Sequence, residues 1–378
     1  MKILIDENIP LGIEFFGDMG EIVRLPGRKI TANDVKDADV LIVRSVTQVN
    51  AQLLAGSRVK FVGTCTIGID HLDLDYLNAQ SIPWANAPGC NANSVVEYVY
   101  AALAALDVNW TKAKVGIIGC GNVGGLLYRR FKAQGAELRC YDPNLSVKDI
   151  PELTSLADVL ACDVVSMHTP LVVEGPHPSF HLLTKSELTQ LPHGAVLINA
   201  GRGSVINNQD LLSLLNERND LRVVLDVWEP EPNISIPLLE KVLIGSPHIA
   251  GYSYDGKLNG TEMIYQALCQ FLSRPPTKSL KNLVPKLQDN ILDAGHLTDA
   301  WAVAKHLILQ AYNIDSDNAR LRETAHDSLI KRIPINEGFD LLRKHYPKRR
   351  EFHNYRVTYH HASQHTKDWL SQLGFQCE

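Results

Sequence analysis

The sequence lacks paired cysteines, long apolar runs and a large excess of charge of either sign. Its 7 cysteines are scattered and odd in number, without a Cys-x-x-Cys pair, which argues against a disulfide framework and against a structural zinc site. It has no run of about 18 apolar residues, such as a membrane-spanning helix needs. The net charge of −5 gives the whole chain no attraction to nucleic acid or to an anionic membrane.

These absences narrow the class of protein. The start of the chain lacks the charged and apolar regions of a signal peptide, so we expect a cytoplasmic protein with reduced thiols. We also expect no metal site, no nucleic acid partner and no membrane partner. With 378 residues, 45% of them hydrophobic and 21% charged, the chain has the composition of a globular protein of two or three domains. Its ligand is expected to be a small molecule.

Short apolar segments alternate with helical patterns in the first part of the chain. This alternation is typical of a parallel sheet flanked by helices. We expect strands here at Lys2–Ile5, Val40–Ser45, Lys60–Cys65 and Ile82–Ala87.

A second unit begins with a long helix at Asn91, where Ser94 and Glu97 have the spacing of a capping box. Strands that alternate with stretches long enough for a helix follow it, which predicts a doubly wound sheet. These strands are expected within residues 114–118, 136–142, 163–168, 195–199, 221–228 and 242–249.

The composition changes after a Pro-Lys-Ser linker at Ser273–Asn282. We assign Leu283–Glu378 to a third, smaller domain. Its patterns predict helices at 299–312, 317–325 and 336–346 and an alternating strand at 355–361.

A glycine motif, Gly119-x-Gly121-x-x-Gly124, follows an apolar strand and opens a helix. In a dinucleotide-binding turn the first glycine permits the tight bend, the second lets the backbone approach a pyrophosphate, and the third lets helix and strand pack closely. Asp142 ends the next strand, where a carboxylate accepts hydrogen bonds from the adenosine ribose. Because that carboxylate would repel a 2′-phosphate, the motif predicts NAD and disfavours NADP.

Three later loops, "INAGRGSVIN", "LDVWEPEP" and "SPHIAGYS", each contribute one group that a dehydrogenase needs. Arg202 can bind a carboxylate with its planar fork. Glu231 can hold one nitrogen of an imidazole, and His248 can then take a hydroxyl proton while hydride leaves the same carbon. Taken singly, Arg202 is also explained as a surface cation, Glu231 as a solvated acid and His248 as a packing residue.

The runs "GCGNVGG", "DVVSMHTPL", "LINAGRGSVIN", "DVWEPEP" and "PHIAGYS" resemble the D-isomer-specific 2-hydroxyacid dehydrogenases over roughly Met1–Ser273. The resemblance implies NAD as cofactor and Arg202, Glu231 and His248 as the catalytic set. It implies a Rossmann-type doubly wound parallel sheet, at residues 93–250, inserted in a flavodoxin-like split substrate domain at residues 1–92 and 251–282. A small α+β C-terminal dimerisation domain at residues 283–378 would join a homodimer.

The same resemblance extends to residues around the catalytic set. The expected substrate contacts are Ser45, Thr66 and Tyr252, although turn capping also explains the first two and a wedge between domains explains the tyrosine. The expected cofactor contacts, besides the glycine motif, Asp142 and Arg202, are Asn122, Val123, Thr169, Ala200, Gly201, Asp226 and Gly251. Asp226 is expected to stabilise the positive nicotinamide ring.

Some residues depart from the family pattern, namely Cys65, Ile69 and Gly201, where a small residue, a threonine and a serine are usual. The run "PHIAGYSYDGK" and the additional domain resemble a branch of the family that acts on a small phosphorylated 2-hydroxy acid. From its charge, the basic run Arg343–Phe352 is a candidate to hold its phosphate, although a solvated face is the simpler explanation of that run. Two alternatives remain open, which are another dehydrogenase of the family, such as a phosphoglycerate dehydrogenase, and a non-catalytic, NAD-sensing protein resembling the family's corepressors.

Overall fold

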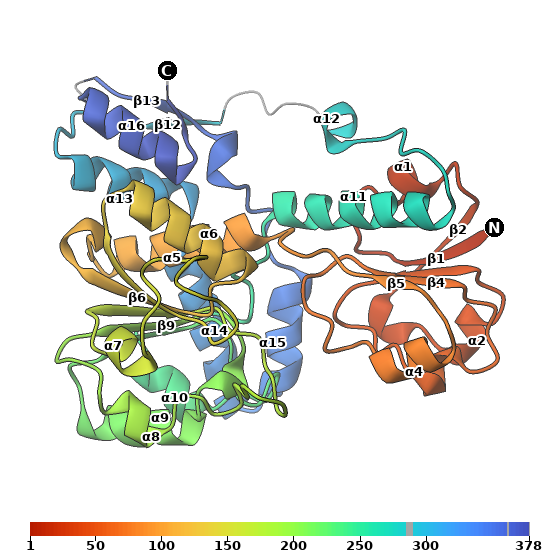
Figure 1. Cartoon of the computed structure of the whole chain (residues 1–378), viewed down its shortest axis with the longest axis horizontal. Helices are drawn as coiled ribbons and strands as arrows, with labels where there is room; N and C mark the ends of the chain where they lie inside the picture. The colour runs from red at the N-terminus through yellow and green to blue at the C-terminus, as the bar shows by residue number, and fades with distance from the viewer. Residues whose placement is uncertain (285–289, 361–362, 378) are drawn as a thin grey trace. The chain divides into compact units, whose positions relative to one another are not determined.

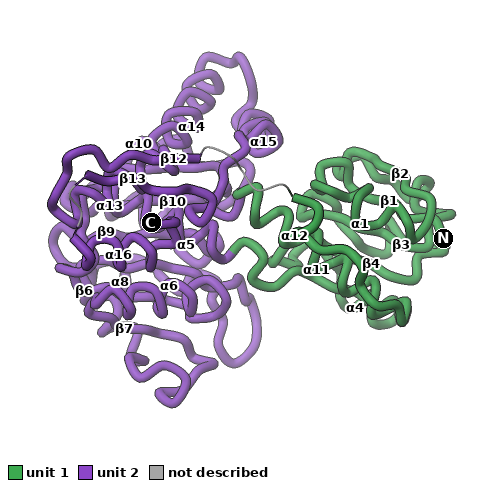
Figure 2. The backbone as a smooth tube through the Cα atoms, turned by 90° about the horizontal axis from the view of Figure 1, so that it is seen from above, with its two compact units in different colours: residues 1–91, 253–288 green, residues 92–252, 289–378 purple. Residues whose placement is uncertain are grey.

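The computed structural model describes residues 1–284, 290–360 and 363–377, and the chain forms two compact units (Figures 1 and 2). Unit 1 consists of Met1–Asn91 and Ser253–Gln288, and unit 2 of Ala92–Tyr252 and Asp289–Glu378. The chain therefore leaves unit 1 near residue 92 and returns to it near residue 252. The C-terminal residues belong to the same compact unit as the glycine motif, so their separation as a third domain stays a prediction.

Unit 1 is built on a five-stranded parallel sheet in the order β2-β1-β3-β4-β5. This order is that of flavodoxin-like sheets, as the resemblance implied. The strands are β1 (Lys2–Asp6), β2 (Glu21–Leu25), β3 (Val40–Val43), β4 (Phe61–Thr64) and β5 (Trp84–Ala85). The helices are α1 (Gly12–Phe16), α2 (Ala32–Val35), α3 (Ala51–Leu54), α4 (Leu74–Ala79), α11 (Tyr254–Phe271) and α12 (Leu280–Leu283).

Unit 2 contains a six-stranded parallel sheet in the order β11-β10-β9-β8-β6-β7, which confirms the predicted doubly wound sheet. The strands are β6 (Lys114–Ile118), β7 (Glu137–Tyr141), β8 (Val164–Met167), β9 (Val196–Asn199), β10 (Arg222–Leu225) and β11 (Ile244–Gly245). The helices in this part are α5 (Ala92–Ala105), α6 (Asn122–Ala133), α7 (Leu156–Leu160), α8 (Lys185–Leu188), α9 (Asn208–Glu217) and α10 (Ile236–Lys241). Because β6 pairs with β7 on one side and β8 on the other, the strand order reverses at β6, where ligands of such sheets bind.

The C-terminal segment adds a small three-stranded parallel sheet and four helices to unit 2. The helices α13 (Ala300–Ala311), α14 (Ile314–Leu329), α15 (Ile335–Lys344) and α16 (Gln364–Leu373) include the three predicted from the sequence. The strands are β12 (Ile291–Asp293), β13 (Arg356–Thr358) and β14 (Gln376–Cys377). The strand predicted at 355–361 is shorter than expected, and its last residue, His361, lies outside the described residues.

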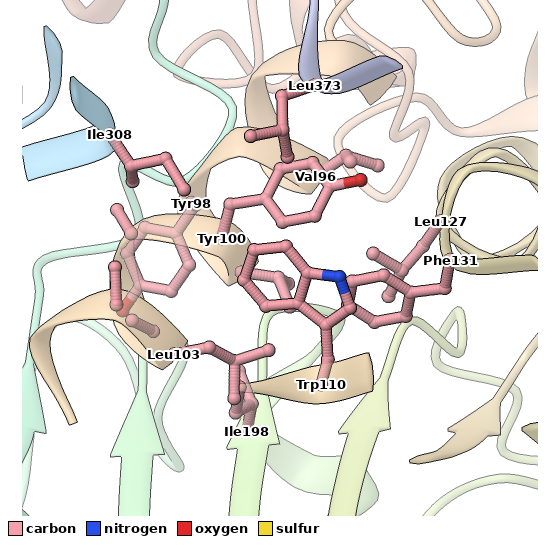
Figure 3. Close-up of a cluster of buried hydrophobic side chains, with 14 of the residues drawn as sticks. Val96, Tyr98, Tyr100, Leu103, Trp110, Leu127, Phe131, Ile198, Ile308 and Leu373 are labelled. Atoms are coloured by element: carbon pink, nitrogen blue, oxygen red, sulfur yellow. The ribbon is translucent and has the colours of Figure 1, made fainter. Parts of the chain in front are cut away.

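One hydrophobic core joins the C-terminal segment to the nucleotide-binding part of unit 2. Trp110 is fully buried and stacks on Phe131, with 5.6 Å between ring centroids. Ile308 of α13 and Leu373 of α16 belong to the same cluster (Figure 3). Helix α13 also lies beside α5 (Figure 1). This shared core fixes the C-terminal helices relative to the loops at the end of the six-stranded sheet.

The capping box predicted at Ser94 and Glu97 is wrong. Helix α5 already begins at Ala92, so Ser94 lies inside the first turn. Its hydroxyl donates to the carbonyl of Ala250 at 2.7 Å, and Glu97 accepts from the N–H of Phe352 at 2.9 Å. The long-range partners of these two side chains replace the local ones that the spacing suggested.

Two observations concern the expected reduced thiols and the expected lack of a membrane partner. All 7 cysteines are free thiols, and 6 of them are buried. Among the residues that the structure describes, no helix combines the length and the apolar character needed to cross a membrane.

Candidate active site

The glycine motif lies in the turn between β6 and α6. Gly119 has a φ of +83°, and a Cβ there would come within 2.9 Å of the Thr169 nitrogen. A Cβ on Gly124 would lie 1.9 Å from the Gly119 oxygen, so both positions exclude a side chain. A Cβ on Gly121 would meet no heavy atom within 4 Å. The open space that the described residues leave beside this second glycine fits the close approach of a pyrophosphate.

Asp142 directly follows β7 and forms a hydrogen bond with this turn. One carboxylate oxygen accepts from the Cys120 N–H at 2.9 Å, and the other accepts from the Asn144 N–H at 3.0 Å. The remaining lone pairs lie beside the turn, where they suit the hydroxyls of a ribose. Asn122 and Val123 are the first residues of α6, whose N–H groups suit phosphate oxygens. The residues present therefore fit a dinucleotide.

The loops that follow β8 and β9 meet at the same end of the sheet. Thr169 donates from Oγ1 to the Ile118 carbonyl at 3.3 Å, and the Ala200 N–H donates to the Met167 carbonyl at 3.2 Å. A Cβ on Gly201 would lie 2.8 Å from the Thr169 oxygen and 2.9 Å from its nitrogen. This close approach gives a physical reason for glycine at a position where the family usually has serine.

Arg202 stands between this loop and the loop that follows β10. Its Nη1 donates to the Gly201 carbonyl at 3.0 Å, and its own carbonyl accepts from the Asn199 side chain at 3.0 Å. A Cβ on the next residue, Gly203, would lie 1.8 Å from the Trp228 oxygen. The backbone of the Arg202 loop is therefore packed directly against the segment that leads to Glu231.

Glu231 and His248 form the hydrogen-bonded pair that the sequence predicted. The His248 Nδ1 lies 2.7 Å from the Glu231 Oε2, and the Trp228 N–H donates to Oε1 of the same carboxylate at 2.9 Å. The two side chains are 32% and 21% exposed, so the imidazole remains accessible to a ligand. If Nδ1 is the donor to the carboxylate, the free base of the neutral ring is Nε2.

The carboxylate of Glu231 is held in its ionised form. Burial on its own would raise the pKa of Glu231, but the charge of His248 and the hydrogen bond from it act in the opposite direction. The Trp228 N–H and the charge of Arg343 add to that effect, and the pKa lies below its ordinary value. An ionised Glu231 can therefore support a positive charge on the imidazole during a reaction.

Asp226 fixes the backbone that carries His248. Its Oδ1 accepts from the Ser246 hydroxyl at 2.6 Å and from the Ile249 N–H at 2.8 Å, while Oδ2 accepts from the Ala250 N–H at 2.9 Å. Burial raises the pKa of Asp226, and the charge of His248 opposes that effect. The carboxylate thus holds His248 in a left-handed backbone conformation with a φ of 55°. A contact of Asp226 with the nicotinamide stays a prediction.

Tyr252, which follows Gly251 in the same loop, contacts the C-terminal segment. The Arg343 Nε donates to its hydroxyl at 3.1 Å, and the guanidinium lies 5.4 Å from the centre of its ring. Arg349 donates from Nη2 to the Ala250 carbonyl at 2.6 Å. From the sequence both arginines were only members of a basic run, because nothing local links them to residues near 250.

The expected substrate contacts of unit 1 follow neighbouring strands of its sheet. Ser45 is exposed in the turn after β3, and Thr66 follows β4, which pairs with β3. The Thr66 hydroxyl donates to the Gly68 carbonyl at 3.0 Å and lies 2.8 Å from the Thr64 hydroxyl. Cys65 is buried between these two threonines. The substrate contacts of Ser45 and Thr66 stay predictions.

Comparisons with known proteins agree with this geometry. Residues 97–250 match the NAD binding domain of the D-isomer specific 2-hydroxyacid dehydrogenases, and residues 283–374 match a domain family of unknown function, DUF3410. The chain is 64% identical to the erythronate-4-phosphate dehydrogenase of Cellvibrio japonicus over 377 residues, covering 100% of both chains. It is 48% identical to the enzyme of the same name from Teredinibacter turnerae, covering 95% of each.

Solved structures share the fold at lower identity. A D-lactate dehydrogenase from Aquifex aeolicus, complexed with NAD and lactic acid, has a TM-score of 0.61 at 22% identity and covers 72% of this chain and 96% of its own. An NAD+-bound 3-phosphoglycerate dehydrogenase from Entamoeba histolytica has a TM-score of 0.62 at 23% identity, with 76% and 99% covered. Nearly the whole of each of these two structures therefore corresponds to about three quarters of this chain.

Proposed function

The chain belongs to the erythronate-4-phosphate dehydrogenases of the D-isomer specific 2-hydroxyacid dehydrogenase family, and from this we propose that it oxidises 4-phospho-D-erythronate to 2-oxo-3-hydroxy-4-phosphobutanoate. It is an NAD-dependent dehydrogenase. The observation that carries the proposed mechanism is the 2.7 Å pair of Glu231 and His248, in the same unit as the glycine motif. In the cell this reaction would serve the synthesis of pyridoxal 5′-phosphate, the active form of vitamin B6.

In the proposed reaction the protein moves a proton at His248 Nε2. That nitrogen takes the proton of the C2 hydroxyl while the C2–H bond breaks and the C2=O double bond forms. NAD+, which the glycine motif and Asp142 would hold, would supply the acceptor for the hydride that leaves C2. Glu231 stabilises the imidazolium that results, and the proton then passes from Nε2 to water. Protons and electrons balance, since one hydride and one proton leave the substrate.

Arg202 would bind the substrate carboxylate and orient C2. A guanidinium forms two parallel hydrogen bonds with a carboxylate, which fixes the plane of the substrate. Its charge also polarises the neighbouring oxygen as the carbonyl forms. Its guanidinium is held in part by the hydrogen bond of 3.0 Å from Nη1 to the Gly201 carbonyl.

The substrate assignment is tested by NADH formation with a panel of phosphorylated 2-hydroxy acids. We expect kcat/KM to be at least about tenfold higher for 4-phospho-D-erythronate than for 3-phosphoglycerate, as differential binding of the two carbon skeletons allows. A preference for 3-phosphoglycerate would assign the chain to another reaction of the family. NADH binding without turnover of any 2-hydroxy acid would instead support an NAD-sensing role.

Replacing Glu231 by glutamine should move the acid limb of the pH profile of kcat/KM to lower pH. Oxidation needs a neutral imidazole, and the ionised Glu231 carboxylate favours the protonated ring; glutamine removes that effect but keeps the shape. The maximal rate should fall by about tenfold or more, because the imidazolium loses its counter-charge. The measurement compares the pH profile of kcat/KM of the variant with that of the unaltered protein. An acid limb at the same pH in both would show that Glu231 does not affect the protonation of His248.

We also propose that the protein is a cytoplasmic homodimer joined through the C-terminal segment. Free thiols suit a reducing compartment. The segment exposes several apolar side chains, such as Leu329 at 59%, Ile330 at 46% and Leu341 at 43%. Sedimentation velocity should give the mass of two chains, and a single-chain mass at micromolar concentration would refute the dimer.

A further inference from the structure

Arg343 reaches the catalytic loop from a distant part of the chain. It lies near the end of α15, in the segment that matches the separate family of unknown function. Its Nε donates to the Tyr252 hydroxyl at 3.1 Å, and the guanidinium lies over the Tyr252 ring, 5.4 Å from its centre. Tyr252 directly follows the Ile249–Gly251 part of the His248 loop, so the arginine stands at the edge of the proposed site.

The positive charge of Arg343 is not matched by an ion pair. Within the part of the chain that the structure describes, no carboxylate lies within 4.0 Å of its guanidinium, and neither Nη1 nor Nη2 has a hydrogen-bond partner. The group is only partly exposed. Burial would lower the pKa of Arg343, but the charge of Glu231 and the hydrogen bond to Tyr252 act in the opposite direction, and the pKa lies above its ordinary value. A sheltered cation with two free donor groups is suited to binding an anion.

The other arginines of the basic run have different partners. Arg349 donates to Ser94 and to the Ala250 carbonyl, and its guanidinium lies 4.0 Å from the centre of the Tyr312 ring, so it supports the loop from beneath. Arg350 donates to Asn354 at 2.7 Å. Lys344, the neighbour of Arg343 on α15, is exposed. The basic run, which the sequence suggested as one phosphate-binding cluster, therefore consists of residues with different contacts.

The proposed substrate needs a second cation. Besides its carboxylate it carries a phosphate with a charge of about −1.5 to −2 at neutral pH. Arg202 would bind the carboxylate, and the ionised Glu231 would repel the phosphate. Arg343 is a cation of the C-terminal segment that contacts Tyr252, next to the His248 loop.

We propose that Arg343, together with the Tyr252 hydroxyl that it positions, binds the phosphate group of the substrate and so determines the preference for a phosphorylated 2-hydroxy acid. This inference rests on the proposed function. The Nη1 and Nη2 groups of Arg343 donate to phosphate oxygens, while its Nε holds the Tyr252 hydroxyl in place. The C-terminal segment thereby contributes a specificity-determining residue to the site.

The test compares Arg343→Met with Arg343→Lys and with the matched control Lys344→Met, which removes the same charge from the next residue of the helix. In Arg343→Met the KM for 4-phospho-D-erythronate should rise by about 10- to 100-fold, the value of losing a charge-assisted pair of hydrogen bonds, with a much smaller change in kcat. The KM of Arg343→Lys should lie between those of Arg343→Met and the unaltered protein. The KM of Lys344→Met should equal that of the unaltered protein.

A second ligand separates phosphate binding from general positioning. D-Erythronate lacks the phosphate, so its inhibition constant against 4-phospho-D-erythronate should be the same in Arg343→Met as in the unaltered protein. A fall in kcat with an unchanged KM, or an equal weakening of both ligands, would overturn the inference and leave Arg343 as a support for the loop. If the unaltered protein fails to oxidise 4-phospho-D-erythronate at all, the proposed function itself is wrong, whatever the variants do. NADH binding by each variant shows that it is folded.

Discussion

Replacing His248 by asparagine should lower kcat by about 10²- to 10⁴-fold, the range found for losing a general acid or base, and should leave NADH affinity unchanged. The neutral imidazole can accept a proton at Nε2, because its Nδ1 lies 2.7 Å from the Glu231 carboxylate. Asparagine retains a hydrogen-bonding side chain but has no base. Steady-state turnover and NADH fluorescence titration measure the two quantities separately.

Asparagine is the appropriate substitution because of the backbone at residue 248. The φ of 55° lies in the left-handed region, which asparagine adopts more readily than most residues. The Asp226 carboxylate can continue to hold Ile249 and Ala250, so the loop should keep its shape. An equal loss of turnover and of NADH binding in this variant would mean that His248 is a structural residue.

Replacing Arg202 by methionine should lower kcat/KM for the phosphorylated substrate by about 10²- to 10³-fold, because a bidentate pair with the substrate carboxylate is lost. Methionine fills a similar volume and leaves the glycines on either side unaltered. Both KM and kcat should change, since the guanidinium binds the carboxylate and also polarises the reacting carbon. Arg202→Lys, which keeps the charge but lacks the planar fork, should recover only part of the loss. Kinetics indistinguishable from the unaltered protein would remove Arg202 from the proposed catalytic set.

The fold could be predicted from the sequence where the local signal was strong. Buried parallel strands appear as continuous apolar runs, and all six strands of the large sheet were found in this way. Strand β2 was missed because it lies at the edge of its sheet, where none of its residues is fully buried and no apolar run marks it. The capping box failed for another reason, since Ser94 and Glu97 are used by tertiary contacts that the spacing of two residues cannot reveal.

In the site, too, some residues could be predicted from local sequence signals and others could not. Arg202, Glu231 and His248 follow successive strands of one parallel sheet, so their chain order places them at one edge, and the predicted Glu231–His248 pair is present. The contact between Arg343 and Tyr252 joins residues 91 positions apart through a helix outside that sheet. No periodicity or motif in a single sequence records such a contact. Co-variation among relatives is the signal that could have found it.

Asp226 has a role in the structure besides the cofactor contact that was predicted for it. It directly follows β10, as the predicted strand implied, and its predicted contact with the cofactor stays a prediction. Its oxygens, however, accept hydrogen bonds from Ser246, Ile249 and Ala250, and its burial raises its pKa. The carboxylate therefore orients the His248 loop. Spacing alone identifies a residue near a site, whereas its hydrogen-bond partners identify what it does there.

The most direct test of the account is to follow the hydrogen that leaves C2 of the substrate. In a single turnover of 4-phospho-D-erythronate labelled with deuterium at C2, in the presence of NAD+, mass spectrometry should find the deuterium in the reduced cofactor and none in the solvent. That result would show hydride transfer from C2 to NAD+ by this chain. Deuterium released to water, or retained in an unoxidised substrate, would contradict the proposed reaction.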